Sequence, residues 1–523
     1  MTLEHKIGAM LVYGWSGENR DEQTTVNSHA REIVQDMHVG GIVLLGRNIA
    51  DDLTSTVNTL NELQSISREP LLMIADQEGG MVARFTDGVT LFPSNMALGA
   101  TRAPHLAYKA AAATAEELKA LGVNYNFAPC VDINNNPANP IVGTRSYGDS
   151  PEKVAGLAAW AIRGYQDNGV IACAKHFPGH GDTAVDSHLA LPSVPYPRER
   201  LDEVELRPFR AAITASVSTI MTTHIMFPAL DTERPSTLSH TIITGLLRNE
   251  LGYDGVIVTD CLEMKAVADN FGTAEAAVMA IEAGVDLVLI CHTLDTQREA
   301  REAILKAVVD GRITESRLDE SVARIAALKE SYSLQSRRFA DPEALGSVLR
   351  RQDHLTLQRT IAERSVTLMK NENAIIPLDM QEDNKVLVIG LHSSVAALGE
   401  AVRAYRAKVG AVSIEGGDEE DAIETALGAA SKADVIIVPT CPNEPWKAPT
   451  DQALQARLVR SLAGLGKKLI VVAVREPYDI GQFPEVGTYI CAYGYRGGSL
   501  EAAAALIFGQ IEPRGALPVT IPV

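Results

Sequence analysis

The chain lacks a block of lysine and arginine residues, a long apolar run and any closely spaced pair of cysteines. Its 47 basic residues are outnumbered by 66 acidic ones, which gives a formal net charge of −19. Because a nucleic-acid-binding domain needs a clustered basic surface, we expect no nucleic-acid partner. No window of about 18 uninterrupted apolar residues occurs, so we also expect no membrane-spanning helix.

The amino terminus, Met1 to Lys6, has no basic region followed by the apolar stretch of a secretory signal. The cysteines lie singly in or beside apolar runs, which favours reduced thiols in the core over disulfides or a zinc site. They are Cys130, Cys173, Cys261, Cys291, Cys441 and Cys491. Both observations lead us to expect a cytoplasmic protein.

Short apolar runs alternate with segments of helical periodicity through the first part of the chain. The runs are Met10 to Tyr13, Gly41 to Leu45, Leu71 to Ala75, Tyr125 to Asp132, Val170 to Ala174, Thr219 to Thr223, Val256 to Thr259 and Asp286 to Ile290. Eight such units within about 290 residues favour a TIM-type (β/α)8 barrel over the alternative, an open doubly wound sheet.

The remaining chain predicts a second, smaller α/β sandwich domain. Buried parallel strands are expected at Val386 to Gly390, Val435 to Pro439, Leu469 to Val474 and Tyr489 to Ala492. A charged, loop-like stretch, 336–353, follows a helical segment and is the expected connection. We therefore predict a catalytic barrel over 1–336, a linker over 337–358 and the sandwich over 359–523.

Polar residues collect directly after the predicted barrel strands. They include Asp76, Asp132, Lys175, His176, His224, Asp260 and His292. In a barrel these strand ends form one mouth, which is where active sites lie.

The segment from Lys175 to His188 is the densest group of titratable residues in the chain. Asp186 and His188 are separated by one small residue, so the carboxylate can hold the imidazole as an acid/base dyad. The histidines of this segment could alternatively be zinc ligands. Their spacing spans a Pro-Gly-His-Gly loop and no cysteine joins them, so we expect no metal.

Two further groups point to chemistry on a polyhydroxylated ligand. Asp260 follows a run of buried β-branched residues, which would hold a nucleophilic carboxylate rigidly. Asp76, Arg84 and Arg145 follow other strands, and carboxylates with guanidinium groups suit the paired donors and acceptors of a sugar. The alternative is that these arginines only pair with acids in the wall.

Several motifs in the same order give the chain a specific family resemblance. Asp76-Gln77-Glu78-Gly79-Gly80, Lys175-His176-Phe177-Pro178-Gly179-His180-Gly181 and Asp186-Ser187-His188 resemble those of glycoside hydrolase family 3, in its β-N-acetylglucosaminidase branch. Segments of the second domain, such as Arg475-Glu476-Pro477-Tyr478-Asp479, are also similar to the family's sandwich domain.

The resemblance implies a retaining mechanism without metal or organic cofactor. Asp260 matches the nucleophile that forms a covalent glycosyl-enzyme, and His188 matches the acid/base that Asp186 orients. The matched positions that hold the sugar hydroxyls are Asp76, Arg145, Lys175 and His176, with Arg84 close by; His224 also matches a motif position.

The leading expectation is an exo-acting β-N-acetylglucosaminidase that acts on muropeptides or chitin oligosaccharides. Because an imidazole base would not repel a phosphate dianion, a phosphorylase is the mechanistic alternative. A β-glucosidase and a sugar-binding protein without turnover are further alternatives. Trp446, in the second domain, is expected either at the domain interface or at the aglycone site; the oligomeric state stays open.

Overall fold

We describe a computed structural model of the chain, in which residues 1–183, 191–379, 383–414, 418–441 and 451–522 are placed. The first part forms an eight-stranded parallel barrel, in the order β7-β6-β5-β4-β3-β2-β1-β8. An isolated parallel bridge between Val258 and Leu287 joins the two ends of the sheet. The predicted TIM-type barrel is confirmed, and the open doubly wound sheet is excluded for this half.

Each predicted apolar run matches one strand of the barrel, although β5 extends beyond its run, which was predicted to end at Ala174. The strands are β1 (Leu11–Tyr13), β2 (Gly41–Leu44), β3 (Leu72–Ala75), β4 (Tyr125–Asn126), β5 (Ile171–Phe177), β6 (Thr219–Thr222), β7 (Val256–Val258) and β8 (Val288–Ile290). Strand β4 is shorter than its apolar run, because Pro129 has no N–H group to continue the ladder.

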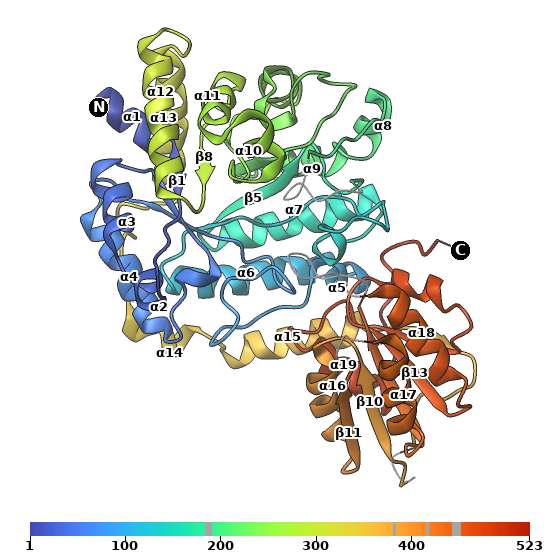
Figure 1. The fold of residues 1–523 in the computed structure, drawn as a ribbon. Coiled ribbons are helices and arrows are strands. Elements are labelled where there is room, and N and C mark those ends of the chain that lie inside the picture. The colour runs from blue at the N-terminus through green and yellow to red at the C-terminus, as the bar shows by residue number, and fades with distance from the viewer. Residues whose placement is uncertain (184–190, 380–382, 415–417, 442–450, 523) are drawn as a thin grey trace.

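Helices surround the barrel and connect its strands (Figure 1). They are α1 (Leu3–Ala9), α2 (Arg20–Thr24), α3 (Ser28–Arg31), α4 (Leu53–Ile66), α5 (Asn95–Ala100), α6 (Pro104–Ala120), α7 (Pro151–Asp167), α8 (Arg198–Glu203), α9 (Arg207–Thr214), α10 (Lys265–Phe271), α11 (Thr273–Ala283), α12 (Leu294–Val309) and α13 (Glu315–Ser331), with π-helical turns at Glu32–Asp36 and Thr241–Glu250. Local chemistry sets their starts: in α7, for example, the Ser150 side chain caps the Lys153 N–H and Pro151 occupies the first turn.

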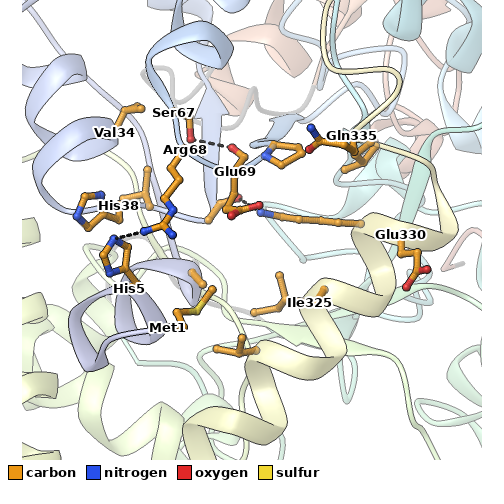
Figure 2. A pocket seen from close by; sticks show the side chains of 18 of the residues that line it. Met1, His5, Val34, His38, Ser67, Arg68, Glu69, Ile325, Glu330 and Gln335 are labelled. Carbon is orange, nitrogen blue, oxygen red and sulfur yellow. Dashed lines mark hydrogen bonds between the residues drawn. The ribbon is translucent and has the colours of Figure 1, made fainter.

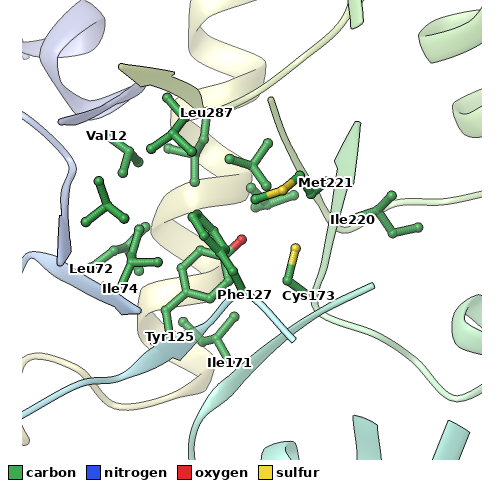
Figure 3. Packing of buried hydrophobic residues seen from close by; sticks show 14 of the residues in the cluster. Val12, Leu72, Ile74, Tyr125, Phe127, Ile171, Cys173, Ile220, Met221 and Leu287 are labelled. Carbon is green, nitrogen blue, oxygen red and sulfur yellow. The ribbon is translucent and has the colours of Figure 1, made fainter. Parts of the chain in front are cut away.

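Apolar side chains fill the barrel, so it is a packed core and not a pore. Val12, Ile74, Phe127, Ile171 and Met221 converge inside it, as Figure 3 shows. Tyr125 and Phe127 meet edge to face, with ring centroids 5.0 Å apart. This packing fixes the strand ends on which the polar side chains of the mouth are carried.

The second domain is built on a six-stranded mixed sheet, in the order β11-β10-β12-β13-β14-β9. Its strands are β9 (Thr367–Asn371), β10 (Val386–Gly390), β11 (Val409–Ser413), β12 (Val435–Thr440), β13 (Lys468–Ala473) and β14 (Thr488–Cys491), and its helices are α16 (Ser394–Arg403), α17 (Glu419–Ala430), α18 (Gln452–Ala463) and α19 (Ser499–Ile507). The predicted smaller α/β sandwich is confirmed. Neither β11 nor the antiparallel edge strand β9 was predicted from the sequence.

The segment between the two sheets is more regular than the predicted loop. It contains a short helix, α14 (Leu345–Val348), and a longer helix, α15 (Gln352–Ser365). Figure 1 shows α15 running from the barrel to the second domain. Met96, Ala97 and Ala100 of α5 belong to the apolar core of the second domain, so the two parts are packed together. The boundaries 336/337 and 358/359 stay predictions.

No helix in the described parts of the chain is long and apolar enough to cross a membrane.

Candidate active site

A cavity of about 470 Å³ opens at the carboxyl ends of the barrel strands. Six of the residues predicted for the site lie on its wall. They are Asp76, Arg84, Arg145, Lys175, His176 and Asp260. They come from segments far apart in the sequence: Asp76 follows β3, Lys175 and His176 lie in β5, and Asp260 follows β7. The closed barrel therefore brings these six side chains into one cavity, whereas the sequence only places them after separate strands.

Two carboxylates and three cations form a continuous ion network on one side of the cavity. Lys175 Nζ lies 2.7 Å from both Asp76 Oδ1 and Glu78 Oε1. Asp76 Oδ2 accepts from Arg84 Nη2 at 2.8 Å. Arg145 donates to both oxygens of Glu78, from Nε at 3.0 Å and from Nη2 at 2.8 Å. Such a bidentate pair fixes the plane of the guanidinium group as well as its position.

The network holds its carboxylates ionised although they are buried. Burial alone would raise the pKa of Glu78, but the charges of Arg145 and Lys175 outweigh it and lower the pKa to about 2. The same balance, with Lys175 and Arg84 as the cations, holds the pKa of Asp76 well below its ordinary value. Burial lowers the pKa of Lys175, yet the two carboxylates raise it above its usual range. These groups therefore present fixed charges to a ligand at neutral pH.

His176 is held between the network and a second buried carboxylate, Asp132. His176 Nδ1 lies 2.7 Å from Asp132 Oδ2, and Arg145 Nη2 lies 3.3 Å from His176 Nε2. A carboxylate accepts and a guanidinium only donates, so the ring carries its proton on Nδ1 and accepts at Nε2. The Asp132 Oδ1 atom also accepts from the backbone N–H of His180 at 2.7 Å. Asp132 thus orients the His176 ring and ties it to the following loop.

Glu78 and Asp132 are the partners that sequence analysis did not assign to the site. Glu78 lies inside the motif quoted for Asp76, and Asp132 ends the fourth predicted strand, so both were visible as candidates. Their role became apparent only through contacts with Arg145 and His176, which are distant in sequence.

Asp260 lies on the cavity wall directly after β7. Its Oδ1 atom accepts from the backbone N–H of Cys261 at 2.7 Å. The next turn is fixed by Glu263, whose carboxylate accepts from the backbone N–H groups of His292 and Thr293 at 2.6 and 3.0 Å. Asp260 is therefore carried on backbone that is anchored to the neighbouring strand end.

His224 is fully buried and is not among the residues that line this cavity. Its Nε2 atom donates to the Cys261 carbonyl at 3.0 Å, and its Nδ1 atom lies 2.9 Å from the Thr237 hydroxyl. In this structure His224 contacts the residue after Asp260, and its predicted contact with sugar stays a prediction.

Asp186 and His188, the predicted dyad, lie outside the described residues, as does Trp446. The segment that leads to the dyad is described as far as Thr183, and it is firmly held. Asn139 Nδ2 donates to the carbonyls of His180 and Gly181 at 2.9 and 3.0 Å. A Cβ atom on Gly181 would lie 1.6 Å from the Ile133 carbonyl oxygen, so glycine here permits a close approach of two backbones.

A larger cavity, of about 760 Å³, lies at the opposite end of the barrel (Figure 2). Gly40 directly precedes β2 and Pro70 lies two residues before β3; both line the cavity, so it faces the amino ends of the strands. Burial lowers the pKa of Lys329 in its wall to about 8. None of the residues predicted for the site lines this cavity. Because barrel active sites form at the carboxyl ends of strands, the smaller cavity is the candidate active site.

The second domain contacts the barrel loop that carries Arg145. Glu476 Oε1 accepts from the backbone N–H of Thr144 at 3.1 Å, and Asn134 Nδ2 donates to the Tyr478 hydroxyl at 2.8 Å. Glu476 is itself paired with Arg475, at 2.7 Å. The second domain therefore holds the backbone of the barrel loop that carries Arg145.

Comparison with known proteins covers both parts of the chain. Residues 2–328 match the Glycosyl hydrolase family 3 N terminal domain, and residues 366–523 match the Glycosyl hydrolase family 3 C-terminal domain. A Beta-hexosaminidase A of Pseudoalteromonas piscicida is 32% identical, over 97% of this chain and 93% of the relative. A Beta-N-acetylglucosaminidase/beta-glucosidase of Cellulomonas fimi is also 32% identical, over 93% of this chain and 89% of the relative.

A solved structure is similar over the whole length. It is a glycoside hydrolase family 3 beta-N-acetylglucosaminidase from a Paenibacillus species, 39% identical, with a TM-score of 0.90. The match covers 100% of this chain and 99% of that one.

Proposed function

Because the chain belongs to glycosyl hydrolase family 3, we propose that it is an exo-acting, retaining β-N-acetylglucosaminidase whose nucleophile is Asp260. It is a glycoside hydrolase, and its full-length similarity to a hexosaminidase and a β-N-acetylglucosaminidase supports hexosaminidase activity. The observation that carries the finer proposal is the position of Asp260 on the cavity wall that also presents Asp76, Arg145, Lys175 and His176.

The ion network suits the recognition of a terminal sugar. The ionised Asp76 carboxylate on the cavity wall accepts from hydroxyl groups, while Lys175 and the two arginines donate to hydroxyl oxygens. A cavity of about 470 Å³ lies within the range of small-ligand sites, which favours an exo-acting enzyme that holds one end of its substrate. Because the network is already assembled, little has to move when the sugar binds.

In the proposed first step, Asp260 attacks the anomeric carbon while the bond to the leaving oxygen breaks. His188 donates a proton to that oxygen, and the product is a glycosyl-aspartate ester. In the second step, the neutral His188 takes a proton from water, which attacks the anomeric carbon and releases N-acetylglucosamine and free Asp260. Asp186 holds the His188 ring in the required tautomer and favours its protonated form.

The role of the dyad rests on the sequence motif and on the chain that leads to it. Thr183, the last described residue before the dyad, is buried, and its Oγ1 accepts from Asn139 Nδ2 at 3.2 Å. The preceding His176 lies on the cavity wall. This anchoring fixes the chain as far as Thr183, three residues before Asp186 in the sequence.

We propose muropeptides or chitin oligosaccharides as the substrates and the cytoplasm as the compartment. The first follows from the family resemblance, and the second from the six cysteines, which are singly placed in the sequence and are buried free thiols in the structure. Cell-wall recycling is the process in which a cytoplasmic enzyme of this specificity would act.

Activity on β-glucosides is a second candidate, because the Cellulomonas fimi relative is named for both activities. Hydrolysis of paired 4-nitrophenyl β-N-acetylglucosaminide and β-glucoside separates the two specificities. We expect the N-acetylglucosaminide to be preferred. A preference for the glucoside would contradict the proposed specificity and leave the assignment to the family intact.

The role of Asp260 is tested with the variant Asp260→Ala and a glycoside that has a good leaving group. We expect the variant to lose turnover and to regain it with sodium azide, which attacks from the vacated side and gives the α-glycosyl azide. Asp254→Asn is the matched control, since Asp254 is exposed near the amino end of the same strand. Wild-type activity in Asp260→Ala would overturn the proposal.

The role of His188 is tested with His188→Ala on two substrates. An acid is needed only for a poor leaving group, so the variant should lose most activity on the disaccharide and much less on a 2,4-dinitrophenyl glycoside in the first step. Equal losses on both substrates in that step would contradict the assignment.

A further inference from the structure

A cluster of two thiols and one imidazole lies next to Asp260 and is not used by the proposed mechanism. Cys261 follows Asp260 after β7, while Cys291 and His292 follow β8. The two strand ends are joined by backbone hydrogen bonds from Thr259 to Leu287, at 3.0 Å, and from Leu262 to Leu289, at 2.9 Å. As a result, one ligand atom from each of Cys261, Cys291 and His292 lies within 4.8 Å of the others.

The cluster is part of the cavity wall, so a small ion can reach it. Cys261 and Cys291 are 8% and 5% exposed, and His292 is exposed. All three residues line the same cavity as Asp260. The thiols are thus shielded from bulk solvent but open to the space that the sugar would occupy.

The surroundings favour a bound cation. Cys261 Sγ lies 3.9 Å from Glu263 Oε2, and that carboxylate accepts from the backbone N–H of His292. Arg47 Nη1 donates to His292 Nδ1 at 3.0 Å, so this nitrogen presents a lone pair, as a metal ligand must. Arg47 also donates to the carbonyls of Cys291 and Trp15, at 2.8 and 3.0 Å. These two bonds hold Arg47 in place when the His292 ring rotates to bind a metal.

We propose that Cys261, Cys291 and His292 form a binding site for one thiophilic divalent metal ion of the zinc class. Two cysteine sulfurs and one imidazole nitrogen are a ligand set that zinc accepts, with water in the fourth position. Binding converts two thiols to thiolates and releases two protons, while the oxidation state of the metal does not change. Glu263 and the two thiolates carry three negative charges, against which Arg47 supplies one positive charge.

The other thiol-containing cluster does not offer the same set. Cys130, Asp132 and His176 also lie close together, but they provide one thiol, and the Asp132 oxygens are occupied by His176 and His180. The metal site is therefore placed at Cys261 and Cys291.

A metal at this position would stand beside Asp260 and inside the sugar cavity. This consequence, unlike the binding itself, rests on the proposed function: we expect the ion to inhibit glycoside cleavage and N-acetylglucosamine to slow its binding. Direct binding measurements separate the two claims, because they do not depend on turnover.

The first test is titration of the reduced, chelator-treated full-length protein with Cd²⁺, followed by the ultraviolet thiolate-to-cadmium band. We expect the band to saturate at one Cd²⁺ per chain. Cys261→Ser and Cys291→Ser should each lose most of it, and His292→Ala should bind at least about tenfold more weakly. Cys491→Ala, which removes a buried thiol of the second domain, and Cys130→Ala should keep the band.

The second test uses the wild-type protein and so does not depend on the folding of variants. X-ray absorption of the Zn²⁺ complex should show two sulfur neighbours at about 2.3 Å and nitrogen or oxygen neighbours at about 2.0 to 2.1 Å. Absence of the cadmium band, its persistence in Cys261→Ser, or a zinc shell without sulfur would overturn the proposal.

Discussion

Glu476 of the second domain accepts a hydrogen bond from the backbone N–H of Thr144, the residue directly before Arg145, at 3.1 Å. The contact is close: a Cβ atom on Gly143 would lie 1.7 Å from Glu476 Oε1, and Gly143 has a φ of +43°. Asn95 Nδ2 holds the other side of the turn by donating to the Arg145 carbonyl, at 2.7 Å. The second domain therefore fixes the backbone from which Arg145 reaches the cavity.

Loss of this contact should weaken sugar binding. We expect Glu476→Ala to raise KM and lower kcat/KM by about tenfold, or ~1.4 kcal/mol, because Arg145 loses its fixed orientation. Glu476→Gln keeps an oxygen that accepts from Thr144 and should recover much of the loss. Glu485→Ala, a half-exposed acid of the same domain, is the control. Identical kinetics for Glu476→Ala and Glu485→Ala, measured with 4-nitrophenyl β-N-acetylglucosaminide, would show that the contact is only structural.

The ion network predicts how stability depends on pH. The pKa of Glu78 falls from 4.5 to about 2 on folding, so its contribution is fully present above pH 4.5 and is lost as the pH falls towards 2. The contribution is about 3 kcal/mol at neutral pH. We expect the free energy of unfolding, measured by denaturant titration, to drop across this window in the wild type.

Glu78→Gln tests the source of that drop. The variant should be less stable at pH 7 by about 3 kcal/mol, because Lys175 and Arg145 lose a buried counter-charge. Its stability should then fall less steeply between pH 4.5 and 2. Glu152→Gln, at an exposed position of α7, should leave both the stability and the slope unchanged. An unchanged slope in Glu78→Gln would mean that other carboxylates cause the acid sensitivity.

His224 should affect catalysis through the backbone that carries Asp260. In His224→Ala the Cys261 carbonyl loses its donor, and we expect kcat to fall by about 10- to 100-fold with a smaller change in KM. The unpaired carbonyl should also lower stability by about 1 to 3 kcal/mol. His224→Gln keeps a side-chain N–H group and should restore part of kcat. If His224→Ala folds and retains wild-type kcat, His224 does not position the nucleophile.

The strands that could be predicted from the sequence are those that are buried on both faces. Barrel strands such as Val256–Val258 are buried on both faces, so they stand out as unbroken apolar runs. Strand β11 (Val409–Ser413) is a sheet edge with partly exposed residues, and β9 (Thr367–Asn371) is mostly half-buried, so neither gives that signal. Helix α15 begins in a charged stretch that reads as a loop, and packing stabilises it against α5, α6 and α19.

The residues that line the cavity could be predicted from the sequence, but the residues that hold them in position could not. Asp76, Lys175 and Asp260 lie at strand ends, and a barrel brings all such ends to one mouth. Glu78 and Asp132 act through Arg145 and His176, and these pairings depend on the closed barrel. The contact of Glu476 with Thr144 joins residues of two domains, and no pattern within either segment indicates it.

The measurement that tests the central claim most directly is product analysis of 4-nitrophenyl β-N-acetylglucosaminide turnover, with and without phosphate, for the wild type and Asp260→Ala. We expect the wild type to release free N-acetylglucosamine at the same rate in both conditions, and Asp260→Ala to release none. Formation of N-acetylglucosamine 1-phosphate that depends on phosphate would make the protein a phosphorylase. Wild-type protein that binds N-acetylglucosamine and cleaves no glycoside would contradict the proposed enzyme activity altogether.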